Sequence, residues 1–260
     1  MAPPRLLGVE KARAALGDRR ARPNWSWLRA LLPEVSQASL AQTLNETSRL
    51  LELERTIRQS HREGGRSFYA QFRAPFELYA LVRLLKPDHV VETGVSSGVS
   101  SAHFLTALQR NGRGTLHSID QPIQQRGVKL APGESGVSVP PGRSSGWAVP
   151  EALRDGWDLR IGSSQKRLPE LIHDIPSIGL FLHDSLHTPR HLTFELSSIE
   201  PKLTARAVVL VDNTIWTGKA LDRFARRHGV RLHRRGRTDL VGLRLPPSQS
   251  SATLSRATFR

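Results

Sequence analysis

Short apolar runs alternate with helix-like patterns over the second half of the chain. Runs with the length of buried strands begin at Val90 and occupy residues 115–120, 157–161, 178–183 and 207–211. Amphipathic, helix-length segments separate or follow them at residues 102–108, 165–173, 189–199 and 218–228. Two further short runs, at residues 230–233 and 240–245, are spaced to form a closing hairpin. Strand–helix alternation of this kind predicts an α/β fold with a doubly wound, mostly parallel sheet of seven strands.

The pattern before this region is helical. Residues 40–58 predict one amphipathic helix, and residues 76–85 predict a second that leads into the first strand. The segment 24–32 holds Trp25 and Trp27 beside leucines, so we expect it to pack on the main domain or on a second subunit in a homo-oligomer. We therefore divide the chain into an N-terminal helical segment or lid (1–74), a main domain (75–247) and a disordered tail (248–260).

One long connection interrupts the alternation. Residues 121–150 are rich in proline, glycine and serine. This segment is too long for an ordinary connection between a strand and a helix. Long loops in compact domains are often functional. We expect this inserted loop, with the N-terminal helices, to cover a substrate.

The region after Val90 changes abruptly from apolar residues to glycine and serine and then to a helix. Residues 92–101 read Glu-Thr-Gly-Val-Ser-Ser-Gly-Val-Ser-Ser. Glycine permits tight backbone turns, and the following helix start offers free N–H groups to an anionic ligand. An ordinary connection in an α/β core is the alternative interpretation.

Polar residues follow all five predicted parallel strands. Asp120, Ser163, Asp184 and the pair Asp212-Asn213 lie at the ends of the second to fifth strands. Ligands of open α/β sheets bind outside the carboxyl ends of the strands. Five consecutive ends of this kind therefore predict a binding site at that edge.

Composition narrows the function classes. The 260 residues carry a net charge of +15, but the arginines are dispersed, which indicates compositional bias more than nucleic-acid binding. The absence of cysteine excludes disulfides and thiolate metal sites. No apolar run approaches the ~20 residues of a membrane span, and no signal peptide is evident. We expect a cytoplasmic protein without a membrane partner.

The spacing Glu92-x-Gly94-x-x-x-Gly98-x-Ser100 resembles the first motif of cation-dependent O-methyltransferases, within the class I S-adenosylmethionine-dependent methyltransferases. Ser96 stands where other methyltransferases have a middle glycine. The resemblance covers about residues 75–245 and implies a Rossmann-like methyltransferase domain.

The resemblance implies roles for the cofactor side. Gly94 and Gly98 would let the backbone pass the methionine part of S-adenosylmethionine, and Glu92 and Ser100 would hold its amino and carboxylate ends. Asp120 would accept the ribose hydroxyls. The remaining expected cofactor residues are Thr93, Ser96, Ser163 near the adenine, and Asp184. Ser163 is equally well placed to cap the helix that follows it.

The resemblance also implies an acceptor side. Asp184, Asp212 and Asn213 match the oxygen ligands of a Mg²⁺ site, and Asp184-Ser185-Leu186-His187 matches the Asp-x-x-His of macrolide-sugar O-methyltransferases. His187 would be the general base beside Asp184. Catechol-type enzymes have lysine at this position, so the histidine argues against a catechol or caffeoyl-CoA substrate.

The sequence is thus identified with a bacterial methyltransferase family related to antibiotic-tailoring enzymes. The expected activity is Mg²⁺-assisted O-methylation of a hydroxylated small molecule or sugar. One alternative is a cofactor-binding, non-catalytic relative, against which the complete set of acids and His187 argues. The other is a nucleic-acid methyltransferase, which would usually carry an Asn/Asp-Pro-Pro-aromatic loop where residues 184–187 read Asp-Ser-Leu-His.

Overall fold

The structure is a computed structural model that describes residues 24–46, 50–64, 72, 74–122, 139–236 and 239–247. Parts of three predicted regions lie outside these residues: the start of the N-terminal segment (1–23), the first part of the inserted loop (123–138), and the tail at 248–260.

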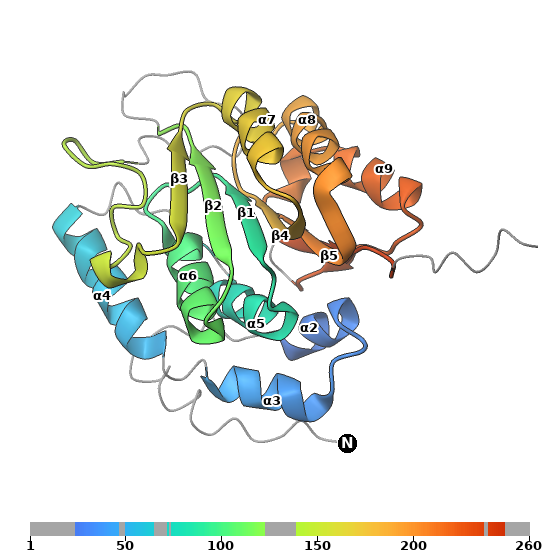
Figure 1. Cartoon of the computed structure of the whole chain (residues 1–260), viewed down its shortest axis with the longest axis horizontal. Coiled ribbons are helices and arrows are strands. Elements are labelled where there is room, and N and C mark those ends of the chain that lie inside the picture. Colours follow the sequence, from blue (N-terminus) through green and yellow to red (C-terminus); the bar gives the residue numbers. More distant parts are fainter. Residues whose placement is uncertain are drawn as a thin grey trace, which may run out of the picture.

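A seven-stranded sheet forms the centre of the molecule (Figure 1). Its order is β3-β2-β1-β4-β5-β7-β6. The first five strands in this order are mutually parallel, and β7 runs antiparallel to both of its neighbours, β5 and β6. The strands are β1 (His89–Thr93), β2 (Thr115–Asp120), β3 (Trp157–Ile161), β4 (Ile178–His183), β5 (Leu203–Val211), β6 (His233–Arg234) and β7 (Val241–Arg244). The predicted doubly wound, mostly parallel sheet and its closing hairpin are confirmed.

Helices cover both faces of the sheet (Figure 1). One face packs against α5 (Pro75–Leu85) and α6 (Val99–Asn111), and the other against α7 (Ser164–Asp174), α8 (Pro189–Ile199) and α9 (Ala220–Arg227). Short 3-10 turns are η3 (Glu151–Leu153), η4 (Glu200–Lys202) and η5 (Thr214–Trp216). The predicted helix at 218–228 is therefore shorter, because Gly218 adopts a positive φ of 56° before α9 begins.

The N-terminal segment joins the core of the first face. Helix α2 (Trp25–Leu31) buries Trp27, whose Nε1 donates a hydrogen bond to the carbonyl of His233 at 2.7 Å. Its predicted packing on the main domain is confirmed, while a second subunit stays a prediction. The single helix predicted over 40–58 is wrong: α3 (Gln37–Glu46) and α4 (Leu51–Gly64) are separate helices. Helix α3 ends at Glu46 and α4 begins at Leu51, and the sequence around this boundary, Asn45-Glu46-Thr47-Ser48, holds three weak helix formers.

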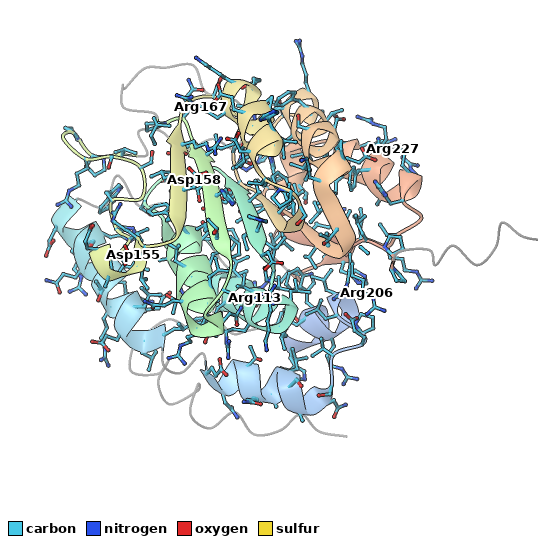
Figure 2. All side chains as sticks on the ribbon, in the orientation of Figure 1. Arg113, Asp155, Asp158, Arg167, Arg206 and Arg227 are labelled. Carbon is cyan, nitrogen blue, oxygen red and sulfur yellow. The ribbon has the colours of Figure 1, made fainter. Side chains whose placement is uncertain are left out.

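The positive charge is dispersed over the described surface. Figure 2 shows Arg113, Arg167, Arg206 and Arg227 on separate parts of the molecule. Several cations pair locally, such as Arg227 with Glu200 at 2.9 Å and Arg167 with Glu170 at 3.0 Å. Among the described helices, none has the length and apolar character to cross a membrane.

Candidate active site

Backbone hydrogen bonds continue past the carboxyl ends of the parallel strands. The N–H groups of the residues just after four strands bond to carbonyls of the neighbouring strand at 2.8–2.9 Å: Gly162 to Asp120, Gly94 to Ile119, Asp184 to Thr93, and Asp212 to His183. This extended ladder fixes the loops in register. The predicted gathering of the strand-end residues at one edge of the sheet is therefore present.

The glycine turn after β1 is packed by the chain itself. Gly94 has a φ of +86°, and a Cβ there would lie 1.9 Å from the carbonyl oxygen of Asp184. Gly98 has a φ of +90°, and a Cβ there would lie 2.4 Å from Cγ2 of Val149. Both positions therefore require glycine, because of neighbouring protein atoms as well as backbone conformation.

Glu92 lies beneath this turn and is fully buried. One carboxylate oxygen accepts hydrogen bonds from the hydroxyls of Ser101 (2.6 Å) and Ser118 (2.7 Å), and the other accepts from Ser100. Burial raises the pKa of Glu92 to about 7, although the three hydroxyl bonds oppose this rise. Glu92 and Ser100 are thus bonded to each other, and Glu92 joins β2 to the start of α6.

Asp120 is also largely buried. Its Oδ1 accepts from the backbone N–H of Val95 at 3.0 Å, and its Oδ2 accepts from the hydroxyl of Ser145. Burial raises the pKa of Asp120 above its ordinary value, and the hydrogen bonds from Ser145, Val95 and Ser96 oppose the rise. Ser145 therefore occupies an oxygen that we expected the cofactor ribose to use.

Ser145 belongs to the described end of the inserted loop, residues 139–149, which we call the strap. The strap lies along the glycine turn: Gly146 N–H bonds to the carbonyl of Ser96 at 2.8 Å, and Ala148 N–H to that of Ser97 at 3.0 Å. Helix α4 packs on the outside, where the rings of His61 and Trp147 meet edge to face at 5.1 Å. The strap thus lies between α4 and the glycine turn.

Two predicted cofactor residues have mainly backbone roles in the structure. Ser96 takes a left-handed conformation with a φ of 52°. Ser163 is the N-cap residue of α7, where its carbonyl accepts from Lys166 and Arg167, but its hydroxyl makes no capping bond. That hydroxyl is therefore not committed to the cap.

The predicted acceptor-side residues lie on two adjacent loops. His187 is buried; its Nε2 lies 3.4 Å from Oδ1 of Asp184 and 3.5 Å from Nδ2 of Asn213. Asn213 reaches this place through a left-handed conformation with a φ of 51°. Burial, and then the charge of Asp184, raise the pKa of Asp212 to about 7, while His187 lowers it. The structure therefore brings Asp184, His187 and Asn213 together and places Asp212 within electrostatic range.

The side chains of Asp184, Asp212 and Asn213 suit a hard cation in part. Two carboxylates and an amide oxygen are ligands that Mg²⁺ takes, with its remaining positions filled by water or substrate. Within the described ranges, however, no three His, Asp or Glu side chains gather closely enough to enclose a metal ion. Any cation would therefore need the oxygen of Asn213 or of a ligand.

A network of buried hydrogen bonds lies behind these loops. Glu195 on α8 is fully buried and accepts hydrogen bonds from Thr93, His183, Ser185 and His191. Burial alone would raise the pKa of Glu195, but His183 and His191 hold it well below its ordinary value. The available signal was polar Thr93 and His183 in the two central strands, where only apolar residues would otherwise be expected.

Residues 91–214 match the family model described as a methyltransferase domain. No curated protein matches the chain.

Three solved structures share the fold, each with a TM-score of 0.51. A Klebsiella pneumoniae protein assigned as an O-methyltransferase is 15% identical and covers 75% of this chain and 90% of its own. The O-methyltransferase NovP is 18% identical, covering 66% and 79% respectively. A Bacillus cereus O-methyltransferase in complex with SAH is 12% identical, covering 74% and 90%.

The family match spans the glycine turn, Asp120, Asp184 and the Asp212-Asn213 pair, which are the residues that the fold brings to one edge of the sheet. On this evidence, residues 91–214 form a methyltransferase domain, and the chain shares its α/β fold with the O-methyltransferases above.

Proposed function

We propose that this methyltransferase transfers the methyl group to a hydroxyl of a small molecule or sugar. The observation that carries the proposal is the close grouping of His187, Asp184 and Asn213 one strand away from the glycine turn. A buried imidazole beside a carboxylate is suited to take a proton from a hydroxyl during its attack on the methyl group.

The cofactor side of the proposal uses the edge formed by β1, β2 and β3. Gly94, Ser96 and Gly98 shape the turn, and Asp120 offers carboxylate oxygens to the ribose hydroxyls. Ser163 would lie beside the adenine, because it follows β3 on the far side of Asp120. Thr93, Glu92 and Ser100 contribute through the shape of the turn beneath the methionine part.

The acceptor side uses the ends of β4 and β5. In this proposal, Asp184, Asp212 and Asn213 hold Mg²⁺, which when bound would lower the pKa of an acceptor hydroxyl and orient it. His187 accepts the hydroxyl proton at Nε2, the ring nitrogen that faces Asp184. Once this nitrogen is protonated, it faces Oδ1 of Asp184, which stabilises the charged ring.

The test separates cofactor binding from methyl transfer. Calorimetry with S-adenosylmethionine should show binding by the wild-type protein and by Asp212→Ala, but weakened binding by Asp120→Ala. Transfer of tritium from labelled S-adenosylmethionine would then be measured on two probes, methyl α-L-rhamnoside and 4-hydroxybenzoate. Asp212→Ala and His187→Ala should abolish transfer.

Asp155→Ala is a matched control, because Asp155 is an exposed carboxylate away from the glycine turn (Figure 2). Its binding and turnover should equal those of the wild type. Absence of S-adenosylmethionine binding would overturn the cofactor site. Turnover that persists in Asp212→Ala and in the presence of EDTA would overturn the metal role alone.

A further inference from the structure

Both carboxylate oxygens of Glu195 accept hydrogen bonds, and the donors lie near the cofactor side and near the acceptor side of the site. Oε2 accepts from the hydroxyl of Thr93 at 2.7 Å and from Nδ1 of His183 at 2.7 Å. Oε1 accepts from the hydroxyl of Ser185 at 2.9 Å and from Nε2 of His191 at 2.9 Å. Four donors on one fully buried carboxylate satisfy its acceptor capacity.

Two of these donors flank Asp184 in sequence. His183 ends β4 and Ser185 follows Asp184 in the next loop, so Glu195 holds the side chains of the residues immediately before and after Asp184. A third donor, Thr93, precedes Gly94 and provides the carbonyl that binds the N–H of Asp184 at 2.8 Å. Glu195 therefore links the loop of Asp184 to the start of the glycine turn.

The same carboxylate also reaches His187 indirectly. The ring of His183 meets the ring of His187 edge to face, with centroids 5.5 Å apart and planes at 85°. Nε2 of His183 is buried without a hydrogen-bond partner among the described residues, so hydrogen bonds hold the ring only at Nδ1, where Glu195 lies at 2.7 Å and the hydroxyl of Ser185 at 3.5 Å. Rotation of His183 would remove the surface against which His187 packs.

A further branch reaches the start of α7. His191, held by Glu195, bonds through its two ring nitrogens to Ser164 at 2.9 Å and to Gln165 at 3.0 Å. These residues follow Ser163 directly. Glu195 thus connects the loops after β1, β3 and β4 through hydrogen bonds to protein groups only.

We propose that Glu195 is a positioning residue for methyl transfer, which fixes Asp184 and His187 relative to the glycine turn without touching either substrate. The proposal rests on the proposed function for the roles of Asp184 and His187. It predicts that disturbing Glu195 lowers kcat much more than it changes the affinity for S-adenosylmethionine.

The experiment compares Glu195→Gln with Glu77→Gln. Both remove the charge of a buried carboxylate with little change in shape, but Glu77 accepts from Arg235 (2.6 Å) and Asn24 (2.7 Å) on the other face of the sheet. Ser185→Ala removes a single donor beside Asp184. Each variant is measured for S-adenosylmethionine affinity by calorimetry, for kcat on the two probes, and for amide hydrogen exchange over residues 183–190.

We expect Glu195→Gln to lower kcat about 100-fold, the size of effect that a 1 Å misplacement causes, with cofactor affinity within about threefold of the wild type. Ser185→Ala should lower kcat about tenfold, by loss of one hydrogen bond to a charged group. Exchange over 183–190 should accelerate in Glu195→Gln but not in Glu77→Gln, whose kcat should be unchanged.

Three results would overturn the proposal: unchanged kcat and exchange in Glu195→Gln, an equal loss of kcat in Glu77→Gln, or a loss of cofactor affinity as large as the loss of kcat. If the wild type binds S-adenosylmethionine but methylates neither probe, the proposed acceptor class fails. Hydrogen exchange then still decides whether Glu195 positions the loop of Asp184.

Discussion

Replacement of Gly98 by alanine tests whether the strap determines the shape of the glycine turn. Gly98 is the N-cap of α6 and has a φ of +90°. A Cβ there would lie 2.4 Å from Cγ2 of Val149 and 3.0 Å from Cα of Gly146, two residues of the strap. The substitution therefore introduces both backbone strain and a steric clash.

The two costs can be separated within one helix. Gly112 at the other end of α6 also has a positive φ, of 64°, but a Cβ there would meet nothing within 4 Å. Gly112→Ala should cost only the strain of a left-handed alanine, about 1–2 kcal/mol. Gly98→Ala should cost this amount plus about 1–3 kcal/mol for overpacking.

The assay is urea unfolding of four variants: Gly98→Ala, Gly112→Ala, Val149→Ala and the double variant Gly98→Ala/Val149→Ala. Removal of the Val149 methyl groups should reduce the cost of Gly98→Ala by about 1 kcal/mol or more, a coupling typical of residues in contact. If Gly98→Ala costs no more than Gly112→Ala, or if the two changes add without coupling, the packing of the strap on Gly98 is wrong.

Two further predictions concern buried carboxylates. Because the pKa of folded Glu92 is raised from 4.5 to about 7, the unfolded chain ionises first and stability is lost as pH rises through this range. The Glu92→Gln variant does not lose this stability. Its free energy of unfolding relative to the wild type should therefore increase by about 3 kcal/mol between pH 4.5 and 7. If the difference in unfolding free energy between the two proteins is constant with pH, the raised pKa is wrong. Ser145→Ala should destabilise the free protein by about 2 kcal/mol, because it removes a hydrogen bond to Asp120. If the ribose uses Asp120, the same variant should bind S-adenosylmethionine at least as tightly in calorimetry, and a tenfold weaker affinity would refute that role.

The centre of the sheet was predictable because strands such as β1 and β4 are buried on both faces. Strands β2, β3 and β4 and helix α8 have the predicted bounds, since short strand-forming runs bounded by turn residues and a Pro-initiated helix mark them without tertiary information. Strand β5 begins four residues before the predicted start at residue 207, because Leu203 to Arg206 lie at a less buried end where the apolar pattern is weak. The split of the predicted helix over 40–58 has the same origin, since helix propensity is only a weak local signal.

The sequence indicated which residues belong to the candidate site, but not which of them contact one another. The spacing of Glu92, Gly94 and Gly98 indicated a ligand-binding turn, whereas the partners that require those glycines, Asp184 and Val149, lie far away in sequence. The sequence likewise did not indicate Ser118 as a partner of Glu92, or Ser145 as a partner of Asp120. Serine occurs in strands and in loops, so its presence carries little information about contacts. Periodicity assigns a residue to a face, but only the packed loops show which polar groups meet.

The packing of Asp184 explains why the cofactor side and the acceptor side of the site cannot move independently. Its N–H bonds to Thr93, its carbonyl oxygen fills the space beside Gly94, and its side chain faces His187. The backbone of Asp184 thus belongs to the cofactor side and its carboxylate to the acceptor side. A change in side-chain chemistry at Asp184 should therefore affect the acceptor step, whereas any change that moves its backbone must also move the glycine turn. Since Thr93 and Ser185 are both bonded to Glu195, a single buried carboxylate keeps that backbone in place while leaving the carboxylate of Asp184 free to interact with His187.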